Sequence, residues 1–212
     1  MQVDINDIEW HRTRAPKDYY FLRRFLAIND FRVALTLACQ ESPMILLGFI
    51  PEYIGEKTSK GHVKKYLRDI TCDLANTTRQ ISHTPDAAFA LEKDGNAALF
   101  FVEIDRGIEI VTDPEKGFLK SVVFYLNYLV EGKFKRYSED FGGREFQAFR
   151  ALVATSSKRR LQNMREAVTK YPFTPAHLKR FIWGARDVGR ENMFSPIWQS
   201  LDVTDDTRYK IG

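Results

Sequence analysis

The sequence predicts a mixed α/β fold with a small central sheet flanked by helices. Three observations lead to this prediction. The chain reads, in order, as helix, strand, hairpin, helix and strand. The predicted hairpin is apolar on both faces, so its sheet needs cover on both sides. The run MILLGFI at residues 44–50 is continuously apolar and lies between two prolines, which is typical of a strand covered on both faces.

The first predicted helix occupies the stretch before Pro43. Apolar residues recur at helical spacing from Phe31 to Ala38. Asn29 and Asp30 directly precede them, and both residue types are favourable N-caps because their side chains accept hydrogen bonds from the first turn. We therefore expect this helix to begin at these two residues and to end near Pro43.

The predicted hairpin is the most informative stretch of the chain. Its apolar runs, 87–91 and 97–104, flank the sequence Lys-Asp-Gly-Asn at 93–96. Asp-Gly between such runs predicts a two-residue turn, because both turn residues must tolerate positive φ. If the turn has two residues, counting outward along both strands brings Asp86 directly opposite Glu103.

Two opposed carboxylates suggest a metal site. Like charges that face each other across antiparallel strands are destabilising unless something compensates them. Mg²⁺, for which Mn²⁺ often substitutes, prefers hard oxygen ligands and usually takes one or two protein carboxylates. Asp86 and Glu103 are therefore candidate ligands, and Asp105 would add a third from the same face. The alternative is that these acids only mark the ends of strands.

The remaining elements follow from periodicity and capping. An apolar stripe from about Glu115 to Val130 predicts a second helix, which Gly132 would end. Beyond it the sequence predicts a buried strand at 148–156, a helix at 157–170, a helix at 175–188, a short strand at 194–203 and frayed last residues.

Length and composition favour one soluble domain. A chain of 212 residues is long enough to bury a full core. We divide it into an N-terminal segment at 1–20, a core at 21–160 and a C-terminal helical extension at 161–212 packed on that core. The two cysteines lie far apart in no metal-ligand spacing, which fits a reducing cytoplasm. The expected absence of a signal peptide and of any membrane-spanning run predicts no contact with a membrane.

The charge balance suggests a polyanionic partner. The formal net charge is +4 and the pI is about 9.0. The basic residues gather in patches, whose alternative interpretation is a solvated loop or exposed strand. We predict nucleic-acid contacts for Lys57, Lys60, Lys64, Lys65, Arg106, Lys133, Lys135, Arg159 and Arg160.

Several segments together resemble one family. They are FLAINDFRVAL at 25–35, TPD at 84–86 and FVEIDRG at 101–107, with Lys120 on the following helix. They look like the bacterial replication-relaxation family of plasmid and mobile-element proteins. The resemblance covers roughly residues 20–160 and implies a PD-(D/E)xK, or restriction-endonuclease-like, three-layer core. It also implies a DNA-associated protein of plasmid replication, relaxation or mobilisation. Relatives often carry a winged-helix DNA-binding domain ahead of this core, so we expect this chain to act either as a stand-alone core or with a protein partner.

The same resemblance implies catalytic roles for Asp86 and Glu103. The nuclease pattern has its third catalytic residue, a lysine, two positions after the glutamate, where this chain has Asp105. The lysine would then come from the next helix, with Lys120 best placed and Lys116 second. Three functions remain open: a Mg²⁺-dependent DNA endonuclease, a catalytically inactive accessory that binds DNA or a protein, and a regulatory domain that binds no nucleic acid.

Histidine chemistry finds little support in the sequence. The four histidines are scattered, and His83, although close before Asp86, is interpreted as a solvated loop residue. No phosphate-binding loop, dinucleotide fingerprint or nucleophile elbow is present.

Overall fold

The computed structural model describes residues 19–57, 63–74, 76–172 and 180–212. A mostly antiparallel seven-stranded sheet lies at its centre, in the order β1-β6-β7-β8-β9-β10-β11. The β7–β8 and β8–β9 pairs are parallel and the other pairs are antiparallel. The strands are β1 (Ile45–Pro51), β6 (Ala87–Lys93), β7 (Asn96–Asp105), β8 (Phe149–Thr155), β9 (Ile182–Arg186), β10 (Trp198–Ser200) and β11 (Arg208–Tyr209).

Two small antiparallel pairs are inserted between β1 and β6. They are β2 (Gly55–Lys57) with β3 (Val63–Lys65), and β4 (Asp69–Asp73) with β5 (Asn76–His83). The second pair has no counterpart among the elements predicted from the sequence. A two-stranded pair of this kind needs packing against a helix to be stable. Here α2 supplies that packing.

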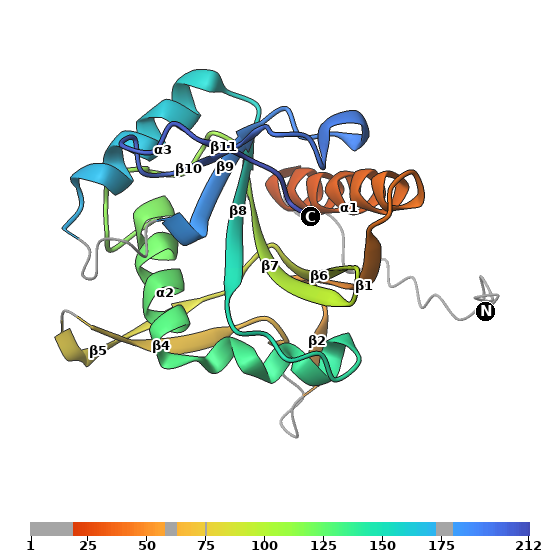
Figure 1. Cartoon of the computed structure of the whole chain (residues 1–212). Helices are drawn as coiled ribbons and strands as arrows, with labels where there is room; N and C mark the ends of the chain where they lie inside the picture. The colour runs from red at the N-terminus through yellow and green to blue at the C-terminus, as the bar shows by residue number, and fades with distance from the viewer. Residues whose placement is uncertain (1–18, 58–62, 75, 173–179) are drawn as a thin grey trace.

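Helices cover both faces of the sheet (Figure 1). α1 (Tyr19–Gln40) lies on one face, whereas α2 (Phe118–Glu131) and α3 (Lys158–Lys170) lie on the other. The described residues also include the 3₁₀ helices η3 (Lys133–Phe141) and η5 (Arg190–Asn192). The mixed α/β class predicted from the sequence is confirmed.

The β6–β7 hairpin has the predicted register. Asp94 and Gly95 adopt positive φ angles of 51° and 79°, so the turn has two residues. Lys93 pairs with Asn96, and the ladder continues regularly to Ala87 and Val102. Asp86 follows as the next residue outward, and its backbone N–H donates to Val102 O at 3.0 Å.

The hairpin buries both of its faces, as its alternating pattern requires. On one face Phe89 and Phe100 stack with ring centroids 4.9 Å apart and pack with Phe31 of α1. On the other, Phe101 packs against Tyr125 of α2 and Phe149 of β8. Burial of this apolar surface on both sides is the main force that holds the sheet between its helices.

The first two helices differ from the prediction at their N-termini. α1 is continuous from Tyr19, so Asn29 is no N-cap. Its amide donates instead to Phe25 O at 2.7 Å, one turn earlier. α2 starts at Phe118 because Gly117 has a φ of 69° and its N-terminal neighbours form a loop. Gly132 ends α2 in the left-handed conformation, as predicted.

The C-terminal third differs most. The predicted helix at 175–188 is wrong in its second half, where the chain forms β9; residues 173–179 lie outside the described residues. The last residues are not frayed, since β11 pairs with β10 and Ile211 is buried. Residues 161–212 are therefore no helical extension, because they contribute three strands to the sheet. Across the described ranges, no helix is both long enough and apolar enough to cross a bilayer.

β1 is less buried than the sequence predicts for the apolar run at 44–50. It pairs only with β6 and therefore forms one edge of the sheet. Most of its side chains are half-buried, whereas the continuous apolar run predicted cover on both faces. A continuous apolar run cannot by itself distinguish a central strand from an edge strand packed against a helix.

Candidate functional site: an acid pocket beside a basic groove

The three predicted metal ligands line one small hollow, which we call the acid pocket. Asp86, Glu103 and Asp105 contribute to its wall from the ends of β6 and β7. Regular alternation along β7 places Glu103 and Asp105 on the same side, as predicted. The volume of the pocket is about 30 Å³, which is on the order of the space that one water molecule occupies in the liquid.

Asp86 is paired with an arginine of α1. Arg24 donates from Nε at 2.6 Å, and its Nη2 lies 2.5 Å from the same oxygen, Oδ1. The other oxygen, Oδ2, accepts the backbone N–H of Ile104 at 2.7 Å. Arg24 Nη2 also lies 2.8 Å from Glu52, which Lys65 contacts at 3.2 Å. Two carboxylates that are each only 4% exposed thus share the charge of one guanidinium.

Glu103 has two protein partners on a single oxygen. The Tyr125 hydroxyl of α2 donates to Oε1, and His83 Nε2 lies 2.7 Å from the same atom. Ser121 Oγ lies 3.5 Å from the other ring nitrogen of His83. Burial, together with the nearby Glu103 charge, raises the pKa of Tyr125 well above its usual value. Tyr125 is therefore protonated at neutral pH and donates its hydroxyl hydrogen to Glu103.

Asp105 is held by the first turn of α3. Arg160 Nε lies 2.7 Å from both carboxylate oxygens, and the Thr155 hydroxyl donates to Oδ2 at 2.9 Å. Ser157 caps α3 by accepting the Arg160 N–H at 3.2 Å, which fixes where that arginine leaves the helix. Arg160 also donates to Glu109 O at 2.7 Å.

The opposed acids have the expected electrostatic effect on each other. Burial and the Glu103 charge raise the pKa of Asp86 to about 7, against the opposing influence of Arg24. Arg24 limits this rise but does not cancel it. Asp86 and Glu103 are therefore close enough to repel one another, as the hairpin register predicts.

The donor set does not fit a bound Mg²⁺ in this arrangement. Both oxygens of Asp86 and of Asp105 already accept hydrogen bonds from the protein. Only Glu103 Oε2 accepts none from the described residues. Within those residues no group of three or more Asp, Glu, His or Cys side chains could hold a metal ion. The predicted Mg²⁺ site stays a prediction, since it requires at least Arg24 to leave Asp86.

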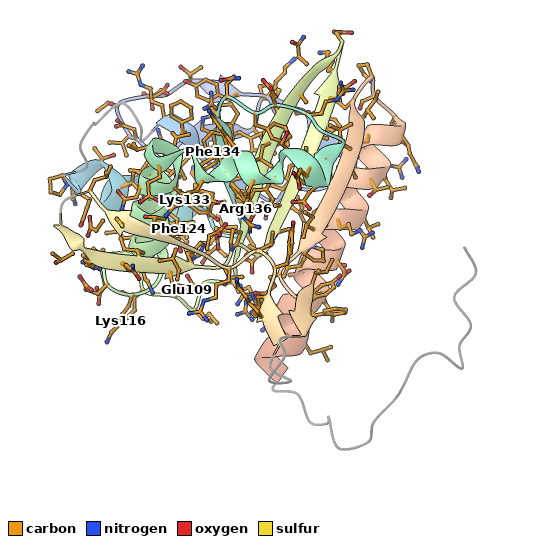
Figure 2. The ribbon with its side chains drawn as sticks, turned by 90° about the horizontal axis from the view of Figure 1, so that it is seen from below. Glu109, Lys116, Phe124, Lys133, Phe134 and Arg136 are labelled. Atoms are coloured by element: carbon orange, nitrogen blue, oxygen red, sulfur yellow. The ribbon has the colours of Figure 1, made fainter. Side chains whose placement is uncertain are left out.

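The predicted catalytic lysine is not in the acid pocket. Lys120 lies in the first turn of α2 and forms no ion pair with Asp86 or Glu103, although all three residues are described. Lys116, the second choice, precedes α2 and is drawn at the edge of the molecule (Figure 2). Within the described residues neither lysine forms an ion pair with Asp86 or Glu103, as a nuclease site made with the two acids would require.

Lys120 instead lines a larger depression, which we call the basic groove. Its main hollow, of about 570 Å³, is lined by Lys64, Lys65, Arg68, Ser82, His83, Thr84 and Lys120. A second hollow of about 130 Å³ shares the first three of these residues and adds Tyr66, Asp69 and Arg136. The Arg136 guanidinium lies 5.2 Å from the Tyr66 ring centroid. The groove begins beside the acid pocket, because His83 belongs to the wall of the groove and contacts Glu103.

The other predicted nucleic-acid contacts are scattered. Arg160 is turned inward onto Asp105, and Arg106 lines the acid pocket. Lys133 binds Glu131 at 2.6 Å and Ile70 O at 2.9 Å (Figure 2). Lys135 and Arg159 are exposed. Lys60 and the side chain of Lys57 lie outside the described residues.

Sequence reasoning missed the cations and donors that neutralise the acids. Arg24 lies within the region of family resemblance, but the sequence predicts no role for it. Tyr125 lies in the predicted second helix and likewise has no predicted role. The interpretation of His83 as a solvated loop residue is wrong, since it ends β5 and contacts Glu103. Its spacing three residues before Asp86 was the one available signal.

Comparisons with known protein families, with curated proteins and with solved structures return no match for this chain.

Proposed function

We propose that this protein binds DNA through the basic groove and that its acid pocket is a structural ion-pair network. In this proposal it is a catalytically inactive accessory protein on a nuclease-like core. The observation that carries it is the pairing of each carboxylate with a side chain of the protein. Directly beside this network lies a groove in which Lys64 and Lys120 have no ion-pair partner among the described residues. The setting in plasmid or mobile-element replication rests on the family resemblance alone.

The charges of the basic groove support a polyanionic ligand. Lys64 and Lys120 make no ion pair or hydrogen bond with the described part of the chain, so their charges are available to a ligand. Arg68 donates from Nε to Ser82 Oγ at 3.0 Å, which orients its guanidinium without neutralising it. Cations lining an elongated groove are the usual electrostatic footprint of a nucleic-acid backbone.

The order of the elements supports the finer fold assignment. α1, the antiparallel strands β1, β6 and β7, the helix α2 and the parallel strand β8 follow one another as in the restriction-endonuclease-like pattern that the sequence resembles. Asp86 and Glu103 fall at its two acidic positions. We therefore propose a restriction-endonuclease-like core, with β9, β10 and β11 extending its sheet.

Two features argue against turnover in this arrangement. Asp86 is bound to Arg24, where a metal would need a free carboxylate. Lys120 forms no ion pair with either acid within the described residues.

The second candidate function is a Mg²⁺-dependent DNA endonuclease. The raised pKa of Asp86 favours it in part. Burial is the larger cause of this shift, and the second is repulsion by Glu103, which a divalent cation between the two acids would relieve. Arg24 is one third exposed and so could leave the pocket. In that case Asp86 and Glu103 would hold the ion, which would supply charge neutralisation for phosphodiester hydrolysis.

One pair of assays distinguishes the candidates. The first measures binding of a labelled DNA duplex at increasing salt for the wild type, the Lys64→Ala/Lys120→Ala variant and the control Lys93→Ala. Lys93 is exposed and lies at the hairpin turn, at the opposite end of β6 from Asp86. We expect the double variant to bind more weakly, with a log–log salt slope smaller by about 1.8, because each lost phosphate contact removes about 0.9. Equal binding by all three proteins would contradict the proposal.

The second assay measures nicking of plasmid DNA with Mg²⁺ or Mn²⁺. The accessory function predicts no cleavage by the wild type, by Asp86→Asn or by Glu103→Gln. Cleavage by the wild type that both substitutions abolish would establish the endonuclease instead. If the protein neither binds nor cleaves DNA, both candidates are refuted and the third function, a regulatory domain that binds no nucleic acid, is the one that remains.

A further inference from the structure

A second cation-lined depression lies beside α3, far along the sheet from β6. We call it the α3 groove, and it is lined by Lys158, Arg159, Leu161, Gln162, Arg165, Gln199 and Arg208. Its volume is about 700 Å³, within the usual range of about 300–1,000 Å³ for ligand sites. Four of its lining residues are cations, and no carboxylate of the part of the chain that the structure describes lines it. The chemistry of the groove therefore selects an anion.

Arg165 forms the floor of the α3 groove and is only 8% exposed. It donates from Nε to Ser200 O at 3.0 Å and from Nη2 to the carbonyls of Asp202 and Asp205 at 3.3 and 2.9 Å. These partners are neutral. Among the described residues its one carboxylate neighbour is Asp206, 3.6 Å away and 94% exposed. A buried cation without a buried counter-charge makes the potential of the groove positive.

The carboxylates of Asp202 and Asp205, in the loop before β11, accept hydrogen bonds from residues that follow them in the chain. Asp202 Oδ1 accepts the N–H of Thr204 at 3.0 Å and its hydroxyl at 2.7 Å. Asp205 accepts the N–H of Thr207 at 3.1 Å and the Tyr209 hydroxyl at 2.7 Å. Their carboxylates therefore stabilise the loop before β11 and do not line the α3 groove.

The rim of the groove is exposed and cationic. Lys158, Arg159 and Arg208 are all exposed, and the first two form no ion pair with the described residues. The three cations in the first turn of α3 belong to two different sites. Arg160 binds Asp105 of the acid pocket, whereas Lys158 and Arg159 line the α3 groove. The two sites are thus distinct, although they share one helix.

We propose that the α3 groove is a second surface for the phosphate backbone of DNA. One protein molecule then holds DNA at two places, the basic groove and the α3 groove. Among the described residues no aromatic side chain lines the α3 groove, so they offer no platform on which a base could stack. Its contacts are therefore to phosphates and independent of sequence. The proposal rests on the proposed function only for the identity of the polyanion.

The test is a double substitution at the exposed rim, Arg159→Ala/Arg208→Ala, which leaves the buried Arg165 in place. Its matched control is Lys170→Ala, an exposed cation in the last turn of the same helix. Binding of a labelled DNA duplex is measured by fluorescence anisotropy between 50 and 200 mM salt. Two lost phosphate contacts reduce the log–log slope by about 1.8. Between 50 and 200 mM salt, the fold-loss of affinity should therefore be about twelve times smaller for the variant than for the wild type.

The outcomes separate this proposal from the proposed function. A smaller slope for Arg159→Ala/Arg208→Ala and an unchanged slope for Lys170→Ala support the second surface. If the rim variant binds like the wild type while Lys64→Ala/Lys120→Ala weakens binding, the α3 groove is not a DNA surface and the basic groove remains one. If the wild type shows no salt-dependent binding, both proposals are refuted. Circular dichroism checks that the variants fold.

Discussion

Removal of Arg24 tests whether the acid pocket is held together by its own cations. Arg24→Ala leaves Asp86, which is 4% exposed, without a counter-charge, whereas Glu52 keeps Lys65. Breaking one partner from a buried ion pair typically costs about 3–5 kcal/mol. We expect a loss near the lower end, about 3 kcal/mol at pH 8, because Asp86 can take up a proton. For a chain of this size that loss lowers Tm by roughly 6–12 °C.

The pH dependence of this loss has a definite sign. The folded pKa of Asp86 is about 7, above its usual value near 3.8, so ionisation of Asp86 weakens the fold as the pH rises toward and through 7. Removal of Arg24 raises that pKa further. The cost of Arg24→Ala should therefore be smaller at pH 6, where Asp86 is protonated in both proteins, than at pH 8.

Chemical unfolding followed by tryptophan fluorescence measures these differences, with Lys93→Ala at the exposed hairpin turn as the control. A loss below about 1 kcal/mol at both pH values would refute the structural role of the Arg24–Asp86 pair. The Arg24→Ala variant also tests whether the acid pocket can bind a divalent metal ion. If it frees the acids, Mn²⁺ at about 100 times its Kd should restore about 2.7 kcal/mol to Arg24→Ala and leave the wild type unchanged.

Two further predictions concern the core. Burial raises the pKa of Tyr125, Tyr128 and Tyr137, so their contribution to stability is present below pH 10 and is lost as the pH rises above it. In an ultraviolet titration, part of the tyrosine absorbance change should therefore coincide with unfolding, and a change that is complete while the protein is still folded would contradict this. Gly184→Ala should cost about 1–3 kcal/mol, because the new Cβ would lie 2.5 Å from Leu161 Cδ1 and 2.8 Å from Leu201 Cδ2. Gly189→Ala, whose nearest atom would be 3.7 Å away, is the control, and equal Tm values for both variants would show that the core absorbs the methyl group.

The parts of the fold that sequence could predict are those that local spacing determines. The turn at 93–96 fixes the hairpin register, and alternation then assigns Phe89 and Phe101 to opposite faces. The Ser157 cap and the Gly132 stop are likewise local features. The juxtaposition of Asp86 and Glu103 follows from the same counting.

The parts that could not be predicted depend on contacts between distant segments. Arg24 lies 62 residues from Asp86 and reaches it only because α1 packs on the sheet. Arg160 lies 55 residues from Asp105 and depends on the position of α3. β9 was mistaken for helix because a short apolar run has no decisive period of its own. Sequence spacing therefore located the carboxylates but could not identify what neutralises them.

The two outer strands of the sheet have a consequence for self-association. An unpaired strand offers its backbone N–H and C=O groups to another molecule and can template aggregation. β1 has a bulge between Leu46 and Gly48 and ends in Pro51, and the ring of Phe141 lies against Gly48. At the far side β11 has only two residues. Neither margin offers a long, flat ladder, so we expect concentrated solutions to resist strand-to-strand polymerisation.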